Sequence, residues 1–123
     1  MTLLILREEF SICKLTCAEG VELTIPFTFL SVTDDEISLV CPTAVVPANT
    51  VNAHDGWRAL KIDGNLDFNM VGVVSRLSAL LAESGISVFI VSTYNTDYIL
   101  VQGQSYQAAI AVLTAGGHRI LQQ

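Results

Sequence analysis

The second half of the chain alternates apolar and polar positions in patterns that predict four strands and two helices. In GWRALKIDG (56–64), apolar side chains occupy close to every second position, as in a half-buried strand. In MVGVVSRLSALLAES (70–84), they recur at helical spacing, and the glycine that follows is suited to end a helix. Two further strands are expected at 86–91 and 98–101, a second helix at 106–115, and a last strand at 118–123.

This order, β-α-β-β-α-β, is that of the ferredoxin-like arrangement, an antiparallel four-stranded sheet with both helices on one face. The first half repeats the plan in reduced form. Its expected strands are 3–7, 11–16, 27–32 and 37–41. Glycine and proline interrupt the two segments where helices should lie, AEGVELTIP and PTAVVPANT, so these segments can hold only one or two helical turns. We expect an α+β protein of two tandem units, a reduced one over 1–50 and a full one over 56–123, with a linker at 46–56.

Composition points to an apolar surface that is covered in an assembly. Hydrophobic residues make up 51% of the 123 residues and charged residues 15%, against about 25% charged in an average protein. No apolar run approaches the roughly 20 residues of a membrane helix, and no basic segment precedes the first apolar residues, as it does in a secretory signal. These features predict a cytoplasmic protein that does not enter a membrane and forms a homodimer.

The net charge of −6 argues against a nucleic-acid partner. Residues 1–56 hold eight acidic and two basic residues, whereas residues 57–123 hold four of each. Because affinity for nucleic acid depends on clustered lysine and arginine, and no basic stripe is present, we expect no nucleic-acid binding.

The cysteines and histidines do not form a recognisable catalytic or metal motif. Cys13 and Cys17 lie in a predicted strand, where four residues span about 13 Å, too far for one zinc ion. With Cys41 they are expected to be reduced, buried structural thiols. The sequence contains neither a nucleophile elbow nor a phosphate-binding glycine loop. We therefore expect no enzyme activity and no cofactor.

The segment STYNTD (92–97), between two apolar strands, is more polar than a hairpin requires. A tight hairpin needs about two turn residues. Asp97 stands out because aspartate is depleted in strands, although it can simply end a turn. Thr93 suits a strand without any ligand, and Tyr94 suits a dimer contact.

The start of the first predicted helix offers complementary chemistry. A helix N-terminus attracts a carboxylate, and Gly72 permits close approach or, alternatively, tight helix–sheet packing. Asn69 is a plausible helix cap, a role that does not exclude binding. If the strand after Gly85 lies at an edge, its backbone can hold the polar head of an amino acid. Asp97 can then neutralise an ammonium or guanidinium group, so a zwitterionic ligand is expected.

The motifs GWRAL, LDF…G and GIS-V-F…STYNTDY-LV, with FSICKL and EISLVCP in the first half, resemble the ACT-domain family. The resemblance is to its arginine-sensor and aspartokinase-type branch, which includes small bacterial proteins. It implies a regulatory domain that binds a small molecule, most often an amino acid, between two ACT units, and acts on an unidentified regulated protein. The ligand-binding residues implied are Asn69, Val71, Gly72, Ser87, Val88, Thr93, Tyr94 and Asp97. An alternative is an ACT-like assembly domain whose ligand site is empty.

Overall fold

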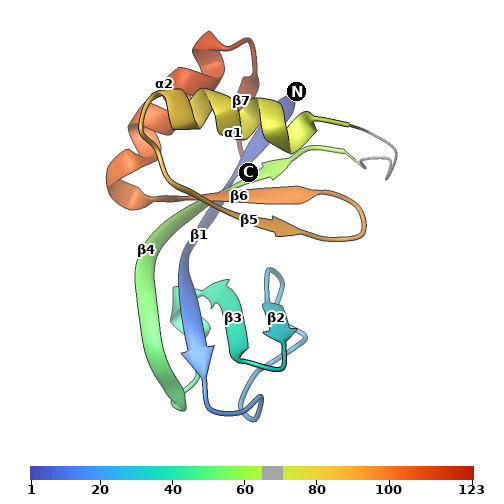
Figure 1. The fold of residues 1–123 in the computed structure, drawn as a ribbon, viewed down its shortest axis with the longest axis vertical. Coiled ribbons are helices and arrows are strands. Elements are labelled where there is room, and N and C mark those ends of the chain that lie inside the picture. Colours follow the sequence, from blue (N-terminus) through green and yellow to red (C-terminus); the bar gives the residue numbers. More distant parts are fainter. Residues whose placement is uncertain (65–70) are drawn as a thin grey trace. The chain divides into compact units, whose positions relative to one another are not determined.

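The computed structural model describes residues 1–64 and 71–123 (Figure 1). Contacts divide the chain into two compact units. Unit 1 comprises residues 1–7 and 58–123, and unit 2 comprises residues 8–57. The division therefore falls within strands β1 (Thr2–Leu15) and β4 (Thr50–Ile62), each of which contributes to both units. Residues 1–7, expected to begin the front unit, belong with the back half of the chain.

Unit 1 has the ferredoxin-like order of elements, with both α-helices on one face of its sheet (Figure 1). Its remaining elements are α1 (Val73–Glu83), β5 (Val88–Ser92), β6 (Asp97–Gln102), the 3-10 turn η2 (Gly103–Ser105), α2 (Tyr106–Ala115) and β7 (Arg119–Gln122). The strand order is β7-β1-β4-β6-β5, in which β5 and β6 are antiparallel. The predicted fold class is confirmed, with one addition. The first residues of β1 form an extra strand that pairs in parallel with β7.

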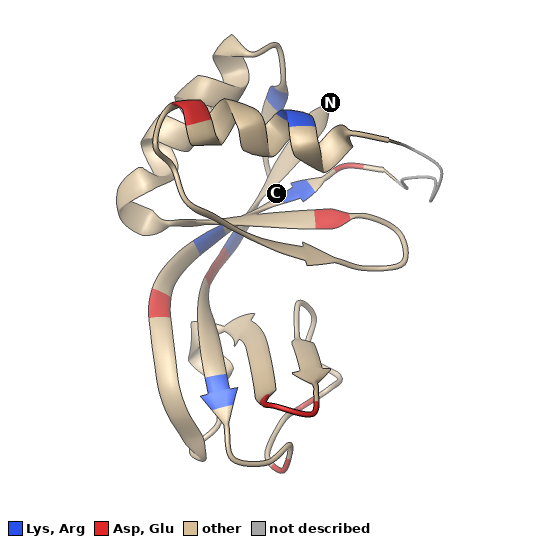
Figure 2. Ribbon diagram, in the orientation of Figure 1, with Lys and Arg blue, Asp and Glu red and all other residues tan. Residues whose placement is uncertain are grey.

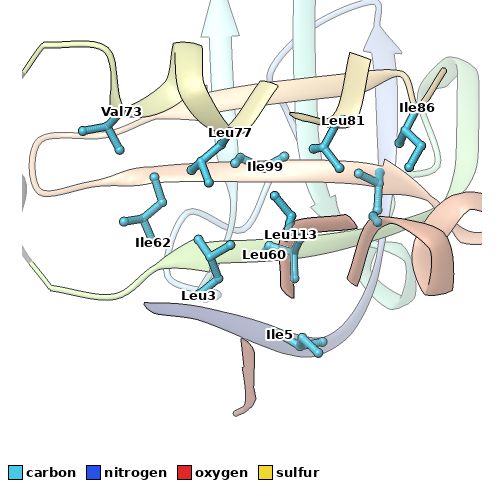
Figure 3. Close-up of a cluster of buried hydrophobic side chains, with 12 residues drawn as sticks. Leu3, Ile5, Leu60, Ile62, Val73, Leu77, Leu81, Ile86, Ile99 and Leu113 are labelled. Atoms are coloured by element: carbon cyan, nitrogen blue, oxygen red, sulfur yellow. The ribbon is translucent and has the colours of Figure 1, made fainter. Parts of the chain in front are cut away.

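The core of unit 1 lies between its sheet and its helices. Figure 3 shows Leu77 and Leu81 of α1 directed at Ile99 of β6, with Val73 near Ile62 of β4. Leu77, Leu81 and Ile99 have no solvent-exposed surface. Burial of a leucine side chain contributes about 2 kcal/mol, so this cluster is the main source of stability for unit 1.

Gly85 ends α1 as predicted. Its φ of 70° lies in the left-handed region that glycine adopts without strain. The amide of Ile86 donates a hydrogen bond to the carbonyl of Leu81 (3.0 Å), and the Ile86 side chain is buried in the core. This closing geometry aims the chain into β5.

Unit 2 repeats the strand order of unit 1 without its α-helices. It contains β2 (Phe29–Val32), β3 (Ile37–Pro42) and η1 (Thr43–Val45), and its strands follow the order β2-β3-β1-β4. Residues 8–57, all of which the structure describes, contain no α-helix. One small buried cluster consists of Cys13, Leu15, Leu39 and Cys41. The prediction of a reduced first unit is confirmed.

Two boundaries predicted in the first half are wrong. The separate strands expected at 3–7 and 11–16 form the single strand β1, because the glutamates between them continue in extended conformation. The linker expected at 46–56 is largely part of β4. Residues 51–55 are exposed on both faces and so lack an apolar alternation, and hydrogen bonding between β4 and its neighbour β1 accounts for their strand conformation.

Candidate functional site

One end of the unit 1 sheet brings together the end of β4, the start of α1 and the β5–β6 turn (Figure 1). The Thr96 hydroxyl donates a hydrogen bond to the carbonyl of Ile62 at the end of β4 (2.9 Å). Within the turn, the amide and hydroxyl of Thr93 both donate to the carbonyl of Thr96 (2.9 and 3.0 Å). Two of the polar residues of STYNTD, Thr93 and Thr96, therefore close the turn and hold it against strand β4.

The start of α1 carries a cation in addition to its free amide groups. Gly72 occupies the cap position with a φ of 79°, and its carbonyl accepts a hydrogen bond from the amide of Arg76 (2.9 Å). The Arg76 guanidinium donates to the carbonyl of Val71 (3.4 Å) and lies 3.2 Å from where a β-carbon on residue 72 would stand. Glycine at this position leaves space for the guanidinium, whose charge adds to the pull of the helix N-terminus on an anion.

The predicted residues around this helix start have different outcomes. Asn69 lies outside the described residues, and its suggested role as the helix cap is wrong because Gly72 occupies the cap position of α1. Its role in ligand binding stays a prediction. Val71, expected on the apolar helix face, lies before the helix and is 86% exposed. That expectation is wrong because Gly72, in the left-handed conformation, caps the helix, which starts at Val73, three residues later than predicted.

The hairpin residues differ in exposure and in their place in the sheet. Asp97 is the first residue of β6, half-buried and paired with Ser92 of β5. Tyr94 is 80% exposed in the turn, and Thr93 is also exposed. Asp97, the one carboxylate in the sequence of this hairpin, therefore lies within the sheet, whereas Tyr94 is exposed in the turn.

Ser87 and Val88 lie at the other end of β5. Val88 pairs with Val101, whereas Ser92, at the turn, pairs with Asp97. These ends are about 13 Å apart at strand spacing. In the described part of the chain, β5 is the last strand of its sheet, which leaves one backbone edge unpaired. Within one chain, the two groups of predicted residues therefore lie at opposite ends of β5.

Sequence reasoning missed a polar pocket of about 320 Å³ at the same end of the unit 1 sheet. Its lining residues come from β4 and the β5–β6 turn: Lys61, Asp63, Gly64, Thr93, Asn95, Thr96 and Tyr98. Leu60 and Ile62 belong to the core under the helices, so Lys61, between them, lies on the opposite sheet face. The strand alternation of β4 contained this information, but Tyr98 was assigned only to an apolar run.

A cation and a tyrosine frame this pocket. The Lys61 ammonium lies 6.0 Å from the centre of the Tyr98 ring, at the outer limit of a cation–π interaction. Burial raises the pKa of Tyr98, so its hydroxyl keeps its proton at neutral pH. Asp63 supplies a carboxylate beside them, and its amide donates to the carbonyl of Thr2 (2.9 Å).

The cysteines are placed partly as expected. Cys13 and Cys41 are buried in unit 2, which confirms their prediction, whereas Cys17 is only half-buried and accepts a hydrogen bond from Asn49 (3.3 Å). Burial raises the pKa of Cys41 to about 12, with a further contribution from Cys13. Within the described residues, no three histidine, cysteine or acidic side chains come together as a metal site. Neither α-helix described is long and apolar enough to cross a membrane.

The acidic residues of the chain gather elsewhere. Figure 2 shows the turn between β2 and β3 in red, where Asp34, Asp35 and Glu36 follow one another. All three are exposed, and the amides of Asp35 and Glu36 donate to the Thr33 hydroxyl (3.2 and 3.1 Å). This turn resembles the Thr93 turn in its hydrogen bonds, and Lys14 of β1 pairs with Ser38, two residues after the turn.

Comparisons with known proteins agree with this architecture. The chain is 31% identical over 111 residues to the mouse (Mus musculus) cytosolic arginine sensor for mTORC1 subunit 1, a match that covers 84% of this chain and 34% of the sensor. The chain thus spans about a third of the length of the curated relatives it matches. Protein Atu0741 of Agrobacterium tumefaciens has a similar structure, with a TM-score of 0.86, 29% identity, and 99% and 92% of the two chains covered.

A more distant structure shares the fold alone. The ligand-free regulatory subunit of Thermus thermophilus aspartate kinase superposes with a TM-score of 0.62 at 10% identity, covering 92% of this chain and 95% of the other. Residues 52–115 match the ACT domain. This match covers half of the chain, together with most of the helices and strands of unit 1, and the chain belongs to the ACT-domain family.

Proposed function

We propose that this protein is a cytoplasmic regulatory module that binds a free amino acid between two copies of the chain. ACT-family membership and similarity to a sensor and a regulatory subunit support a regulatory role in small-molecule binding. The observation that carries the finer proposal is the juxtaposition of the α1 start, with Arg76, and the Thr93–Asp97 turn at one end of unit 1.

The ligand is held by charge complementarity. Its carboxylate meets the free amides at the start of α1, near Gly72 and the Arg76 guanidinium. Its ammonium group, or a cationic side chain, meets the carboxylate of Asp97. A second copy supplies the open edge of β5 at Ser87 and Val88, where backbone groups pair with the polar head of the ligand.

The module has no catalytic role in this proposal and acts through a protein partner. A ligand with higher affinity for one state of the dimer shifts the population toward that state, and the partner responds to the shift. The name of the mouse relative, a cytosolic sensor, supports both the sensing role and the cytoplasmic location.

A thermal-shift screen against the free amino acids tests the proposal. A ligand at about 100 times its dissociation constant adds about 2.7 kcal/mol to the free energy of unfolding and raises the melting temperature. We expect Asp97→Ala to remove this shift. The matched control Asp35→Ala removes an exposed carboxylate from the corresponding turn of unit 2 and should keep the shift. If no amino acid raises the melting temperature, the sensing function is wrong.

The open edge of β5 favours one second candidate, an assembly domain that needs no ligand. Light scattering with and without amino acids separates the two functions. A dimer that forms equally in both conditions, together with no thermal shift, supports assembly alone. A thermal shift that Asp97→Ala removes while the dimer persists supports ligand sensing.

A further inference from the structure

The polar pocket at Lys61 shares the Thr93–Asp97 turn with the proposed function but opens on the other face of the sheet. The α1 start and the core lie on the helix-covered face of the unit 1 sheet, whereas Lys61 and Tyr98 project from the other face. All of its lining residues belong to unit 1. The pocket therefore has no need of a second copy.

The pocket contains one positive and one negative side chain. Lys61 lies in β4 and Asp63 directly follows the end of that strand, and both side chains line the pocket. Two residues at strand spacing are about 7 Å apart along the chain. The hydrogen bond from the Asp63 amide to Thr2 fixes the backbone between β4 and β1. A ligand with opposite charges at the two ends of a short molecule matches this pair.

The β5–β6 turn also offers hydrogen-bonding groups for both ends of such a ligand. The hydroxyls of Thr93 and Thr96 donate their protons to the carbonyls of Thr96 and Ile62, respectively. Their oxygen atoms are therefore left with acceptor capacity, which suits an ammonium group. Asn95 is exposed at the rim and offers an amide that can donate to a carboxylate.

The size of the pocket limits the ligand. At about 320 Å³, the pocket is at the lower end of small-molecule pockets, which range from about 300 to 1,000 Å³. This is enough for a small amino acid and several waters. The polar lining offers little apolar surface to a larger hydrophobic ligand.

We propose that the Lys61 pocket is a second binding site, contained within one chain, for a small zwitterion. The carboxylate of the ligand binds the Lys61 ammonium and the Asn95 amide. Its ammonium binds the Asp63 carboxylate and the threonine oxygens.

Titration of the full chain, followed by two-dimensional amide NMR, tests this site. The probes are glycine, L-alanine and L-glutamine, with acetate and methylammonium as compounds that carry only one of the two charges. We expect a zwitterion to shift the amide signals of Gly64, Asn95 and Thr96 in a saturable way. Lys61→Met should weaken this binding about tenfold or more, because it removes a charged hydrogen bond.

Controls separate this site from the α1 site. Lys14→Met removes an exposed lysine from unit 2 and should leave the titration unchanged. Asp63→Asn, a second pocket variant of nearly the same shape, should also weaken binding. Asp97→Ala should keep the shifts at Gly64 and Asn95 even when it removes those at the start of α1. The proposal is overturned if no zwitterion shifts the pocket signals, if acetate binds as well as the zwitterions, or if both pocket variants titrate like the wild type.

Discussion

Units 1 and 2 share a strand order but differ in what covers their sheets. In unit 1, two α-helices of 11 and 10 residues close a core that includes Leu77, Leu81 and Ile99. In unit 2, irregular segments and a single 3-10 turn occupy the corresponding places, and a smaller cluster surrounds Leu39. The comparison teaches that the strands and turns of this fold tolerate the loss of helices. Prolines at 26, 42 and 47 are sufficient to explain that loss, because proline lacks an amide donor and clashes within a helix.

The two hairpin turns show how much is shared. Thr33 and Thr93 each donate a backbone amide hydrogen bond to the carbonyl three residues later (3.0 and 2.9 Å). Both hairpins are antiparallel and lead directly into a 3-10 turn. The two turns differ at the residue that precedes the second strand of each hairpin, β3 or β6. In unit 1 the buried Thr96 is tied to β4, whereas in unit 2 the exposed Glu36 stands in its place.

Thiol chemistry should show the largest difference, because all three cysteines lie in unit 2. With its pKa raised from 9.0 to about 12, Cys41 holds about a thousandfold less thiolate at mildly alkaline pH than an ordinary thiol. We expect iodoacetamide to modify the half-buried Cys17 first and Cys41 only as unit 2 opens. Mass spectrometry of timed samples measures the order. Rapid labelling of Cys41 in the native protein would mean that unit 2 opens far more readily than its buried cluster suggests.

Core truncation should be the next largest effect. Leu77→Ala is expected to lower the free energy of unfolding by about 3 kcal/mol, since it leaves a cavity under α1. Leu39→Ala should cost less, about 2 kcal/mol, because the smaller cluster and its irregular surroundings can collapse into the space. Urea unfolding followed by circular dichroism measures both variants. A larger loss for Leu39→Ala would show that unit 2, despite its missing helices, is the more tightly packed.

Ser11 in unit 2 and Thr96 in unit 1 are buried residues whose hydroxyls donate to different kinds of acceptor. The Ser11 hydroxyl, in unit 2, donates to the Asp55 carboxylate (2.5 Å) and contacts the Thr43 hydroxyl (2.8 Å), whereas Thr96 donates to a neutral carbonyl. Ser11→Ala should therefore cost about 2 kcal/mol and Thr96→Val about 1 kcal/mol, since bonds to charged groups are stronger. Urea unfolding tests this ranking: the midpoint concentration should fall more for Ser11→Ala than for Thr96→Val, with the same dependence of the free energy of unfolding on urea. Equal losses would indicate that water replaces the serine at Asp55.

Replacing a glycine of left-handed conformation should give the smallest loss in the free energy of unfolding, and the loss should be equal in the two units. Gly85 and Gly56 have φ values of 70° and 84°, and a β-carbon at either position would meet no atom within 4 Å. Alanine at each position should cost about 1 kcal/mol, entirely from the left-handed backbone. Thermal unfolding of the two variants measures the costs. Unequal values would reveal a change in the surroundings of one glycine that its open space does not suggest.

Local patterns in the sequence were sufficient to predict the elements of unit 1. The helical spacing around Leu77 and Leu81, the end of α1 at Gly85 and the paired strands after it all depend on neighbours a few residues away. The strand at 50–56 could not be found in this way. Its side chains are exposed, so only hydrogen bonding to a strand distant in sequence makes it extended.

The sequence predicts the types of residue in the candidate site better than it predicts which of them lie together. The polar character of the Thr93–Asp97 turn is visible in the sequence. Its hydrogen bond to Ile62 depends on the pairing of strands β4 and β6. An arginine in a helix usually indicates an exposed face, so the sequence does not distinguish Arg76. Its place at the start of α1 depends on the space that Gly72 leaves for the guanidinium. Lys61 and Tyr98 meet because β4 and β6 are adjacent, a fact that periodicity alone does not contain.

The pairing of β1 with β7 has a consequence for the speed of folding. Leu3 pairs with Ile120, more than a hundred residues away, and the amide of Arg119 donates to the carbonyl of Met1 (2.9 Å). Such contacts raise the contact order of the domain, and chains of high contact order close their loops slowly. During synthesis, the start of β1 therefore remains without its β7 partner until Arg119–Gln122 leave the ribosome. The apolar β1 segment is the part of the newly made chain most exposed to aggregation, or most in need of a chaperone, during that interval.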